Sequence, residues 1–148
     1  MSIGAPIVFR SATAHDVDAI CDLWDAVQLG GGRSVDAGEI RERLLAADDL
    51  FVVGERTRVD GLVAVAMGCY DNHRGWLKRV AIHPSEQGSG LGRQLIDELE
   101  RRFLAAGITK LRLAVWDHNE AGVAFWSELG YTELVDIRYF TKDLQDRT

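Results

Sequence analysis

The sequence predicts a mixed α/β fold, of the α+β kind, built on a single β-sheet. Strand and helix periods follow one another as strand, two helices, three strands, helix, strand, helix and two strands. The 148 residues fit the usual size of one domain. Their composition, 47% hydrophobic and 27% charged, is typical of a folded globular chain. We therefore predict one domain over residues 1–148, with one mixed sheet of about seven strands and about four helices.

The N-terminal part is expected to form one strand and two helices. Residues 7–11 form the strand, and Thr13 follows as a helix N-cap with Asp16 in a variant of the capping box. Apolar residues then recur at helical spacing over residues 14–29, until three consecutive glycines end the helix. A second helix is predicted over residues 36–47.

Three strands are expected in the middle of the chain. Residues 50–54 and 62–70 are apolar runs separated by a hairpin signal. After a polar turn, the chain alternates between polar and apolar residues from Trp76 to His83. This alternation predicts one strand face formed by Trp76, Lys78, Val80 and Ile82.

The C-terminal part is expected to alternate between helices and strands. A helix begins at Leu91 and ends at Gly107, and residues 110–116 form the next strand. A short helix over residues 119–129 ends at a glycine, and two last strands cover residues 131–135 and 137–142.

Charge and composition exclude several classes of partner. Lys and Arg number 17 against 23 Asp and Glu, a net charge of −6, which argues against a nucleic-acid-binding module. The longest apolar run is about half the length of a membrane span, and the N-terminus lacks a secretory signal. The two cysteines and four histidines lack metal-ligand spacing. We expect a cytoplasmic protein with no metal, nucleic-acid or membrane partner.

A glycine-rich segment between a strand and a long helix is the strongest chemical signal. Alternate glycines let the backbone approach a bulky group, and the N–H groups of the following helix point outward at the positive end of its dipole. Both features favour an anion such as a phosphate, although a flexible surface turn is the alternative. The segment consists of Gln87, Gly88, Ser89, Gly90, Leu91, Gly92 and Arg93.

Three familiar motifs do not fit this segment. Arg93 stands where a dinucleotide-binding fingerprint needs its third glycine. A nucleoside-triphosphate loop needs Lys-Ser or Lys-Thr after its last glycine, which the segment lacks. Gln87 stands where the nucleophile elbow of a hydrolase needs a glycine, so Ser89 is not such a nucleophile.

The segment and its surroundings resemble the GNAT superfamily of N-acetyltransferases. The run Val80-Ala81-Ile82-His83-Pro84, followed by the glycine-rich segment, is similar to the acetyl-CoA motif of that family. Further along the chain, Asn119-Glu120-Ala121 and the run from Phe125-Trp126 to Gly130-Tyr131 are similar to the next motif of the family. Residues 70–75, Tyr-Asp-Asn-His-Arg-Gly, further resemble a small bacterial subfamily.

The resemblance implies an acyltransferase of one N-acetyltransferase domain, with acetyl-CoA as co-substrate in a splayed sheet. Acetyl-CoA would lie between the strand ending at Ile82 and the strand ending at Trp116. The backbone of Val80, Ala81 and Ile82 would pair with the pantetheine arm, and residues 87–93 would wrap the pyrophosphate. Asn119 and Trp126, two turns apart, would face cofactor or acceptor; an N-cap and a packing ring are the alternative.

The catalytic groups remain open at this point. The family often has a tyrosine acid where Trp126 stands, and Tyr139 or water could replace it. His73 is the first candidate for the general base, with an exposed loop histidine as its alternative. His118 is the second candidate, and a water chain would need no side-chain base.

The leading function is transfer of acetyl from acetyl-CoA to a primary amine of a small molecule or a protein, by direct attack. A non-catalytic acyl-CoA-binding module of the same fold is the alternative, and a nucleotide-phosphate binder is a third possibility. We expect a monomer or a homodimer.

Overall fold

The computed structural model describes residues 5–27, 37–45, 49–57 and 59–145. The chain divides after Ala114 into two compact units. Within the described ranges, no helix has the length and apolar character needed to cross a membrane. The expectation of one domain over residues 1–148 stays a prediction.

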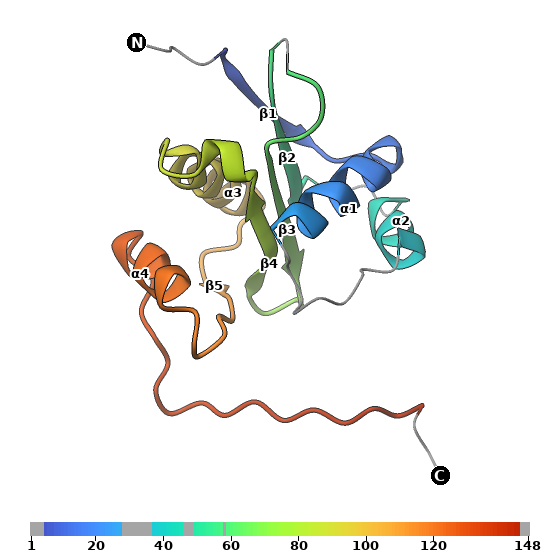
Figure 1. Cartoon of the computed structure of the whole chain (residues 1–148). Helices are drawn as coiled ribbons and strands as arrows, with labels where there is room; N and C mark the ends of the chain where they lie inside the picture. The colour runs from blue at the N-terminus through green and yellow to red at the C-terminus, as the bar shows by residue number, and fades with distance from the viewer. Residues whose placement is uncertain (1–4, 28–36, 46–48, 58, 146–148) are drawn as a thin grey trace. The chain divides into compact units, whose positions relative to one another are not determined.

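The first unit is built on a mixed sheet of five strands (Figure 1). Its strands are neighbours in the order of the chain, antiparallel from the first to the fourth, and the fifth is parallel to the fourth. This confirms the predicted single mixed sheet. The strands are β1 (Ile7–Ser11), β2 (Phe51–Arg56), β3 (Ala64–Tyr70), β4 (Gly75–Ile82) and β5 (Leu111–Arg112).

Helices cover both faces of this sheet (Figure 1). On one face, α1 (Val17–Ala26) and α2 (Ala37–Leu45) pack with alternate strand residues such as Val53 and Val65 in one buried cluster. On the other face lies α3 (Leu91–Ala105), whose Phe103 ring lies against the backbone of β3 and β4. The sheet is therefore held between two layers, and its strand ends and its open edge are the places left for a site.

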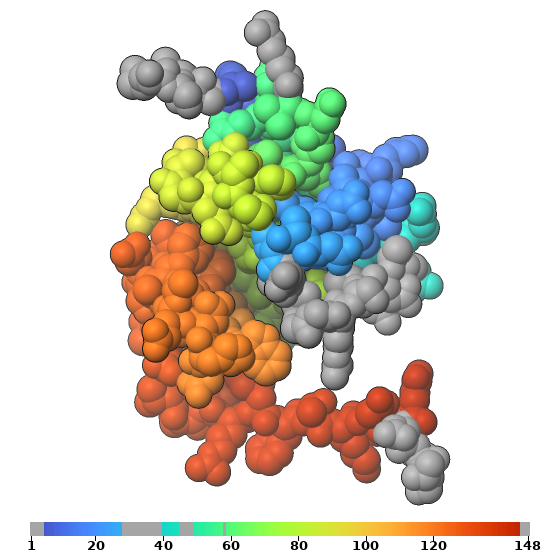
Figure 2. Space-filling view, in the orientation of Figure 1, coloured from blue at the N-terminus to red at the C-terminus, as the bar shows by residue number. Residues whose placement is uncertain are grey.

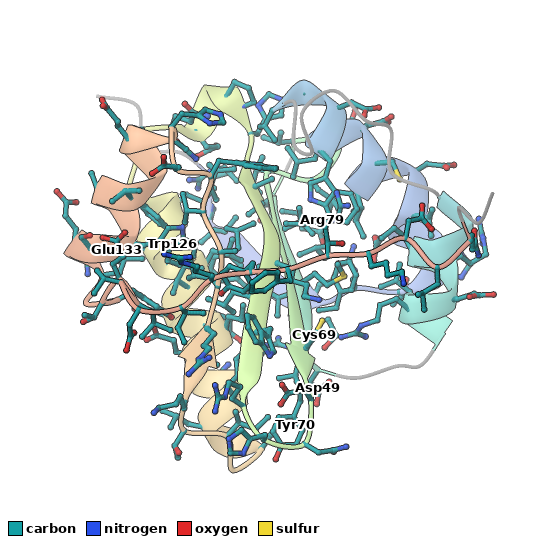
Figure 3. All side chains as sticks on the ribbon, turned by 90° about the horizontal axis from the view of Figure 1, so that it is seen from below. Asp49, Cys69, Tyr70, Arg79, Trp126 and Glu133 are labelled. Carbon is teal, nitrogen blue, oxygen red and sulfur yellow. The ribbon has the colours of Figure 1, made fainter. Side chains whose placement is uncertain are left out.

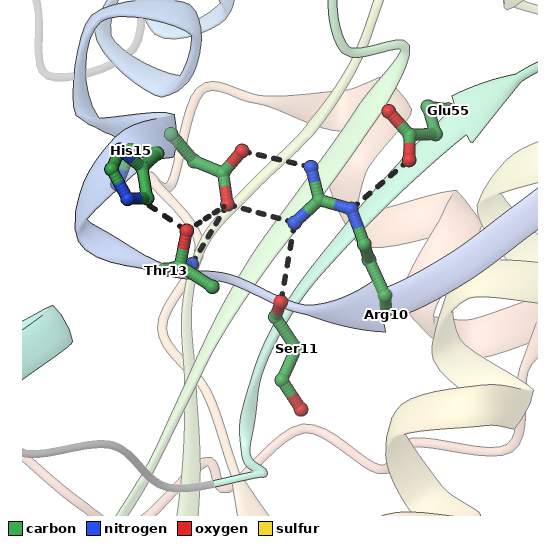
Figure 4. A network of polar contacts seen from close by, with 6 residues as sticks. Arg10, Ser11, Thr13, His15 and Glu55 are labelled. Carbon is green, nitrogen blue, oxygen red and sulfur yellow. Dashed lines mark hydrogen bonds and ion pairs between the residues drawn. The ribbon is translucent and has the colours of Figure 1, made fainter.

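A network of polar contacts fixes the beginning of α1 (Figure 4). Thr13 caps a 3-10 turn that leads into the helix, and its N–H donates to the buried Asp16 carboxylate at 2.7 Å. Arg10 donates two hydrogen bonds of 2.8 Å to Asp16 and one of 3.0 Å to Glu55 on β2. The bonds from Arg10 hold the pKa of Asp16 below its ordinary value. The predicted capping box is thus confirmed.

A β-bulge interrupts β4 and corrects one expectation. Lys78 pairs with Met67 and Ala81 pairs with Val65, so two residues of β4 oppose the single residue Ala66. Arg79, in the bulge, has a φ of 50°, in the left-handed region. The extra residue turns Val80 and Ile82 to the face opposite that of Trp76 and Lys78. The expectation that all four share a face is therefore wrong.

The strand count is five rather than about seven. Residues 131–135 and 137–142 were expected to be strands, but the structure has none between Tyr131 and Gln145. Alternating apolar residues make a strand only where the backbone N–H and C=O groups find a partner strand. This segment has no ladder, and Val135 and Phe140 are 85% and 93% exposed. The fifth strand, expected over 110–116, is likewise limited to Leu111–Arg112.

Candidate active site

The connection from β4 to α3 is shaped by two glycines. His83 Nδ1 accepts a hydrogen bond from the Ser85 N–H at 3.1 Å and begins a 3-10 turn over Pro84–Glu86. Gly88 and Gly90 follow with φ of 82° and 85°, a conformation that other residues adopt only with strain. A Cβ at either glycine would meet nothing within 4 Å. The loop backbone is therefore open to a ligand.

The beginning of α3 is prepared for an anion. Gly90 is the N-cap, no side chain caps the helix, and its first turn holds no acidic residue. The Gln94 N–H is bonded to the Gly90 carbonyl at 3.2 Å, so the preceding N–H groups belong to the open end of the helix. Arg93 adds a positive charge there. In Figure 2 the yellow-green surface, which holds this loop and the start of α3, is open to the viewer.

One edge of β4 lacks a strand partner over most of its length. The ladder between β4 and β5 consists of the pairs Gly75–Leu111 and Trp76–Arg112. Beyond Trp76, within the described residues, β4 has a strand neighbour on its β3 side alone. The backbone of Val80, Ala81 and Ile82 lies on this stretch. A free strand edge of this kind can pair with the amides of an extended ligand.

The bulge in this edge is held by a residue of α1 that the sequence analysis did not assign to the site. Figure 3 shows Arg79 on β4, with Cys69 and Tyr70 on the neighbouring β3. The Trp24 indole N–H donates to the Arg79 carbonyl at 2.9 Å, and the Arg79 guanidinium lies 5.4 Å above the Trp24 ring. The buried Trp24 therefore anchors the left-handed residue. The sequence does not reveal this bulge, because a left-handed φ is usually predicted from a glycine and residue 79 is an arginine.

His73 lies in the turn between β3 and β4. Its side chain is exposed, and its backbone N–H donates to the Asp71 carboxylate at 2.9 Å. Asp71 also accepts from the Trp76 indole and from the Arg74 N–H, and the indole bond is the main cause that lowers its pKa to about 2. His73 precedes β4 and the glycine-rich loop follows it. At about 3.3 Å per residue, the eight residues of β4 separate them by about 25 Å.

In the second unit, Asn119 and Trp126 belong to α4 (Glu120–Glu128). Asn119 is its N-cap: the Asn119 Oδ1 accepts from the Gly122 N–H at 3.0 Å. The Asn119 Nδ2 group takes no part in this cap bond. Trp126, labelled in Figure 3, packs edge-on against Phe125 and Tyr131, with ring centroids 5.0 Å and 5.2 Å away. The Tyr131 phenol beside Trp126 was missed in the sequence, where Tyr131 appeared only as part of a motif.

The two other candidates lie in the same unit. His118 stacks on Trp116 with ring centroids 6.1 Å apart, and both residues are exposed. Tyr139 is 66% exposed in the segment without strands. Within the part of the chain that the structure describes, His118 and Tyr139 share no hydrogen bond or ring contact.

Comparisons with known proteins agree with this geometry. The model of the acetyltransferase (GNAT) family matches residues 17–131. An acetyltransferase of Pectobacterium atrosepticum is 32% identical over 141 residues, which cover 95% of this chain and 96% of the relative. The solved ribosomal-protein-S18-alanine N-acetyltransferase of Escherichia coli has a TM-score of 0.71 at 20% identity, over 87% of this chain and 79% of that one.

A second solved structure, of the Salmonella typhimurium protein yncA with its cofactor acetyl-CoA, has a TM-score of 0.69 at 24% identity. It covers 85% of this chain and 79% of that chain. At these identities the two solved structures show the fold, while the family match and the Pectobacterium relative show the family. The chain is an acetyltransferase and belongs to the GNAT family.

Proposed function

We propose that this acetyltransferase transfers the acetyl group of acetyl-CoA to a primary amine of a small molecule or a protein. The observation that carries the proposal is the junction of β4, the glycine-rich loop and α3. It offers a free strand edge followed at once by an uncapped helix N-terminus. Acetyl-CoA presents the matching groups in the same order, namely two amides and then a pyrophosphate.

Each part of the donor has a partner in this proposal. The backbone of Val80, Ala81 and Ile82 pairs with the pantetheine amides, and the loop with Arg93 surrounds the pyrophosphate. For Asn119 and Trp126, which would line the pantetheine arm, the support is the family pattern alone. The Asn119 Nδ2 group is a donor that the helix cap does not use.

The reaction is a direct displacement at the thioester carbonyl. The neutral amine nitrogen forms a bond to the carbonyl carbon, the carbon–sulfur bond breaks, and the amine proton passes to water. A thiol with a pKa near 8.5 leaves readily as thiolate, so a general acid that protonates the sulfur would accelerate the step only modestly. The net charge of −6 favours a cationic acceptor over an acidic one.

The proposal is tested in two stages. Acetyl-CoA should raise the melting temperature of the protein, whereas ATP and NAD should not. Free thiol should then be released from acetyl-CoA with at least one amine of a panel of small amines and peptides. Protection by ATP or NAD without protection by CoA would instead support a nucleotide-phosphate binder.

A non-catalytic acyl-CoA-binding module is the second candidate, and Trp126 is the observation that favours it. An indole cannot protonate a departing sulfur at any useful pH, and this position often carries a tyrosine in the family. Tight CoA binding without thiol release on any amine would support this candidate.

Substitution of Trp126 separates these two roles. Trp126→Phe keeps an aromatic ring and should change turnover little. Trp126→Tyr adds the acid, and we expect a gain of less than about tenfold in kcat, because thiolate already departs well near pH 8. Steady-state thiol release measures both variants. A gain far above tenfold would show that the parent lacks an acid that it needs.

His73→Ala should leave turnover within about twofold of the parent, because the His73 side chain is exposed in the turn before β4 and, among the described residues, no side-chain hydrogen bond orients it. We propose that water accepts the proton in its place. The pH–rate profile from pH 6 to 9 is the measurement, and His118→Ala tests the second candidate for the base in the same way. A flattened acidic limb and a loss of about a hundredfold would restore His73 as the general base.

A further inference from the structure

We infer that Arg56 is a positioning residue for the acetyl donor: through Glu86 it holds the glycine-rich loop and cancels the negative charge that Glu86 places beside it. The inference rests on the proposed function, in which this loop receives the pyrophosphate.

The two residues form a bidentate ion pair between the end of β2 and the loop. Arg56 Nε donates to Glu86 Oε2 at 2.7 Å, and an Arg56 terminal nitrogen donates to Glu86 Oε1 at 2.8 Å. The other terminal nitrogen donates to the Ala5 carbonyl at 2.5 Å. Arg56 is the last residue of β2, which pairs with strands on both sides. The ion pair therefore links the loop to β2, a strand that lies between two others in the sheet.

Both side chains are mostly withdrawn from solvent, with 17% and 14% of their surface exposed. The hydrogen bonds from Arg56 hold the pKa of Glu86 below its ordinary value. The same bonds raise the pKa of Arg56. Glu86 is consequently charged at any pH at which the enzyme would work, and Arg56 neutralises it.

Glu86 in turn holds the residue between the two left-handed glycines. The Glu86 carbonyl accepts from the Ser89 N–H at 3.2 Å and from the Ser89 Oγ at 2.5 Å. The Ser89 Oγ also lies 3.3 Å from Glu86 Oε1. Gly88 and Gly90 leave the loop many alternative conformations. The chain of contacts from Arg56 through Glu86 to Ser89 selects one of them.

The charge of Glu86 has a second consequence. A carboxylate beside a site for an anionic pyrophosphate would weaken binding unless a cation cancelled it. Removal of Arg56 should therefore harm the site in two ways, by release of the loop and by exposure of a like charge. A purely structural pair would produce the first effect and not the second.

The test compares the affinities for CoA and for pantetheine, two ligands that both contain the pantetheine arm. Arg56→Gln should raise the Kd for CoA by about tenfold or more, measured by titration calorimetry. Its affinity for pantetheine, which carries the arm and no phosphate, should stay within about twofold of the parent. Arg56→Lys keeps the charge but not the bidentate geometry, and its effect on CoA should be smaller. It also serves as the second variant if Arg56→Gln does not fold.

The double variant Arg56→Gln/Glu86→Gln replaces the ion pair by two neutral amides. It should bind CoA more tightly than Arg56→Gln, because no unpaired carboxylate remains, but less tightly than the parent, because the ion pair no longer holds the loop. Arg10→Gln is the matched control: it breaks the comparable pair with Asp16, away from the loop, and should leave the ratio of CoA to pantetheine affinity unchanged.

Three results would overturn the inference. These results are a CoA affinity of Arg56→Gln equal to that of the parent, an equal loss of CoA and pantetheine affinity in Arg56→Gln, and CoA binding by the double variant that is no tighter than that of Arg56→Gln. Each of these leaves the proposed function intact as long as the parent binds CoA. A parent that does not bind CoA would overturn the proposed function, and the inference with it.

Discussion

Gly90→Glu is expected to lower the affinity for acetyl-CoA by about a hundredfold or more while the protein stays folded. The new carboxylate would stand at the N-cap of α3, beside the place proposed for the pyrophosphate. At an effective dielectric constant of about 20, two unit charges of the same sign about 5–6 Å apart repel each other by roughly 3 kcal/mol, which is about a hundredfold in Kd. Titration calorimetry with acetyl-CoA measures the loss, and circular dichroism checks the fold.

Gly61→Glu provides a matched control for this variant. Gly61 also has a left-handed φ, 84°, and a Cβ there would likewise meet nothing within 4 Å. The two variants therefore carry the same backbone strain and the same added charge, at different places in the fold. Equal acetyl-CoA affinity in Gly90→Glu and Gly61→Glu would refute the assignment of the pyrophosphate to this loop.

Phe103→Ala should have the largest effect on stability. The Phe103 side chain is 1% exposed, and its ring fills the space beside Gly68 and Gly75, where β3 and β4 carry no side chain. Loss of a buried Phe typically costs about 3–5 kcal/mol. For a chain of this size we expect the melting temperature to fall by roughly 10–15 °C.

Leu104→Ala, at the next position of α3, controls for a general weakening of the helix. Leu104 is 63% exposed, and substitutions at such positions usually change stability by less than about 0.5 kcal/mol. Thermal unfolding by circular dichroism compares the two variants. Similar losses in both would mean that Phe103 does not fill the space beside Gly68 and Gly75.

The parts of the fold that the sequence predicts well depend on neighbours along the chain. The capping box of Thr13 and Asp16 spans four residues, and the start of α3 follows from glycines and a helical period in direct succession. The whole signal for each lies in one continuous stretch of the chain. Such elements can be recognised from one sequence.

The parts that escaped prediction depend on contacts between distant residues. The bulge at Arg79 is held by Trp24, 55 positions earlier, and Glu86 is held by Arg56, 30 positions earlier. Neither pair produces a periodic pattern of residues in the sequence. The apolar alternation after Gly130 shows the converse, because the pattern of a strand is present without the partner that a strand requires.

The bulge in β4 also bears on how this strand can be redesigned. Because of the extra residue, the alternation of faces along β4 shifts by one position at the bulge. Lys78 and Ala81, which lie three positions apart, therefore share a face of the sheet. A library that randomises alternate positions from Gly75 to Ile82 would therefore mix residues of the two faces of the sheet. In such a library, residues 75–78 and residues 80–82 should be treated as two segments, each with its own alternation of faces. Deletion of Arg79 would merge them into one regular strand and exchange the faces of the segment nearest the loop.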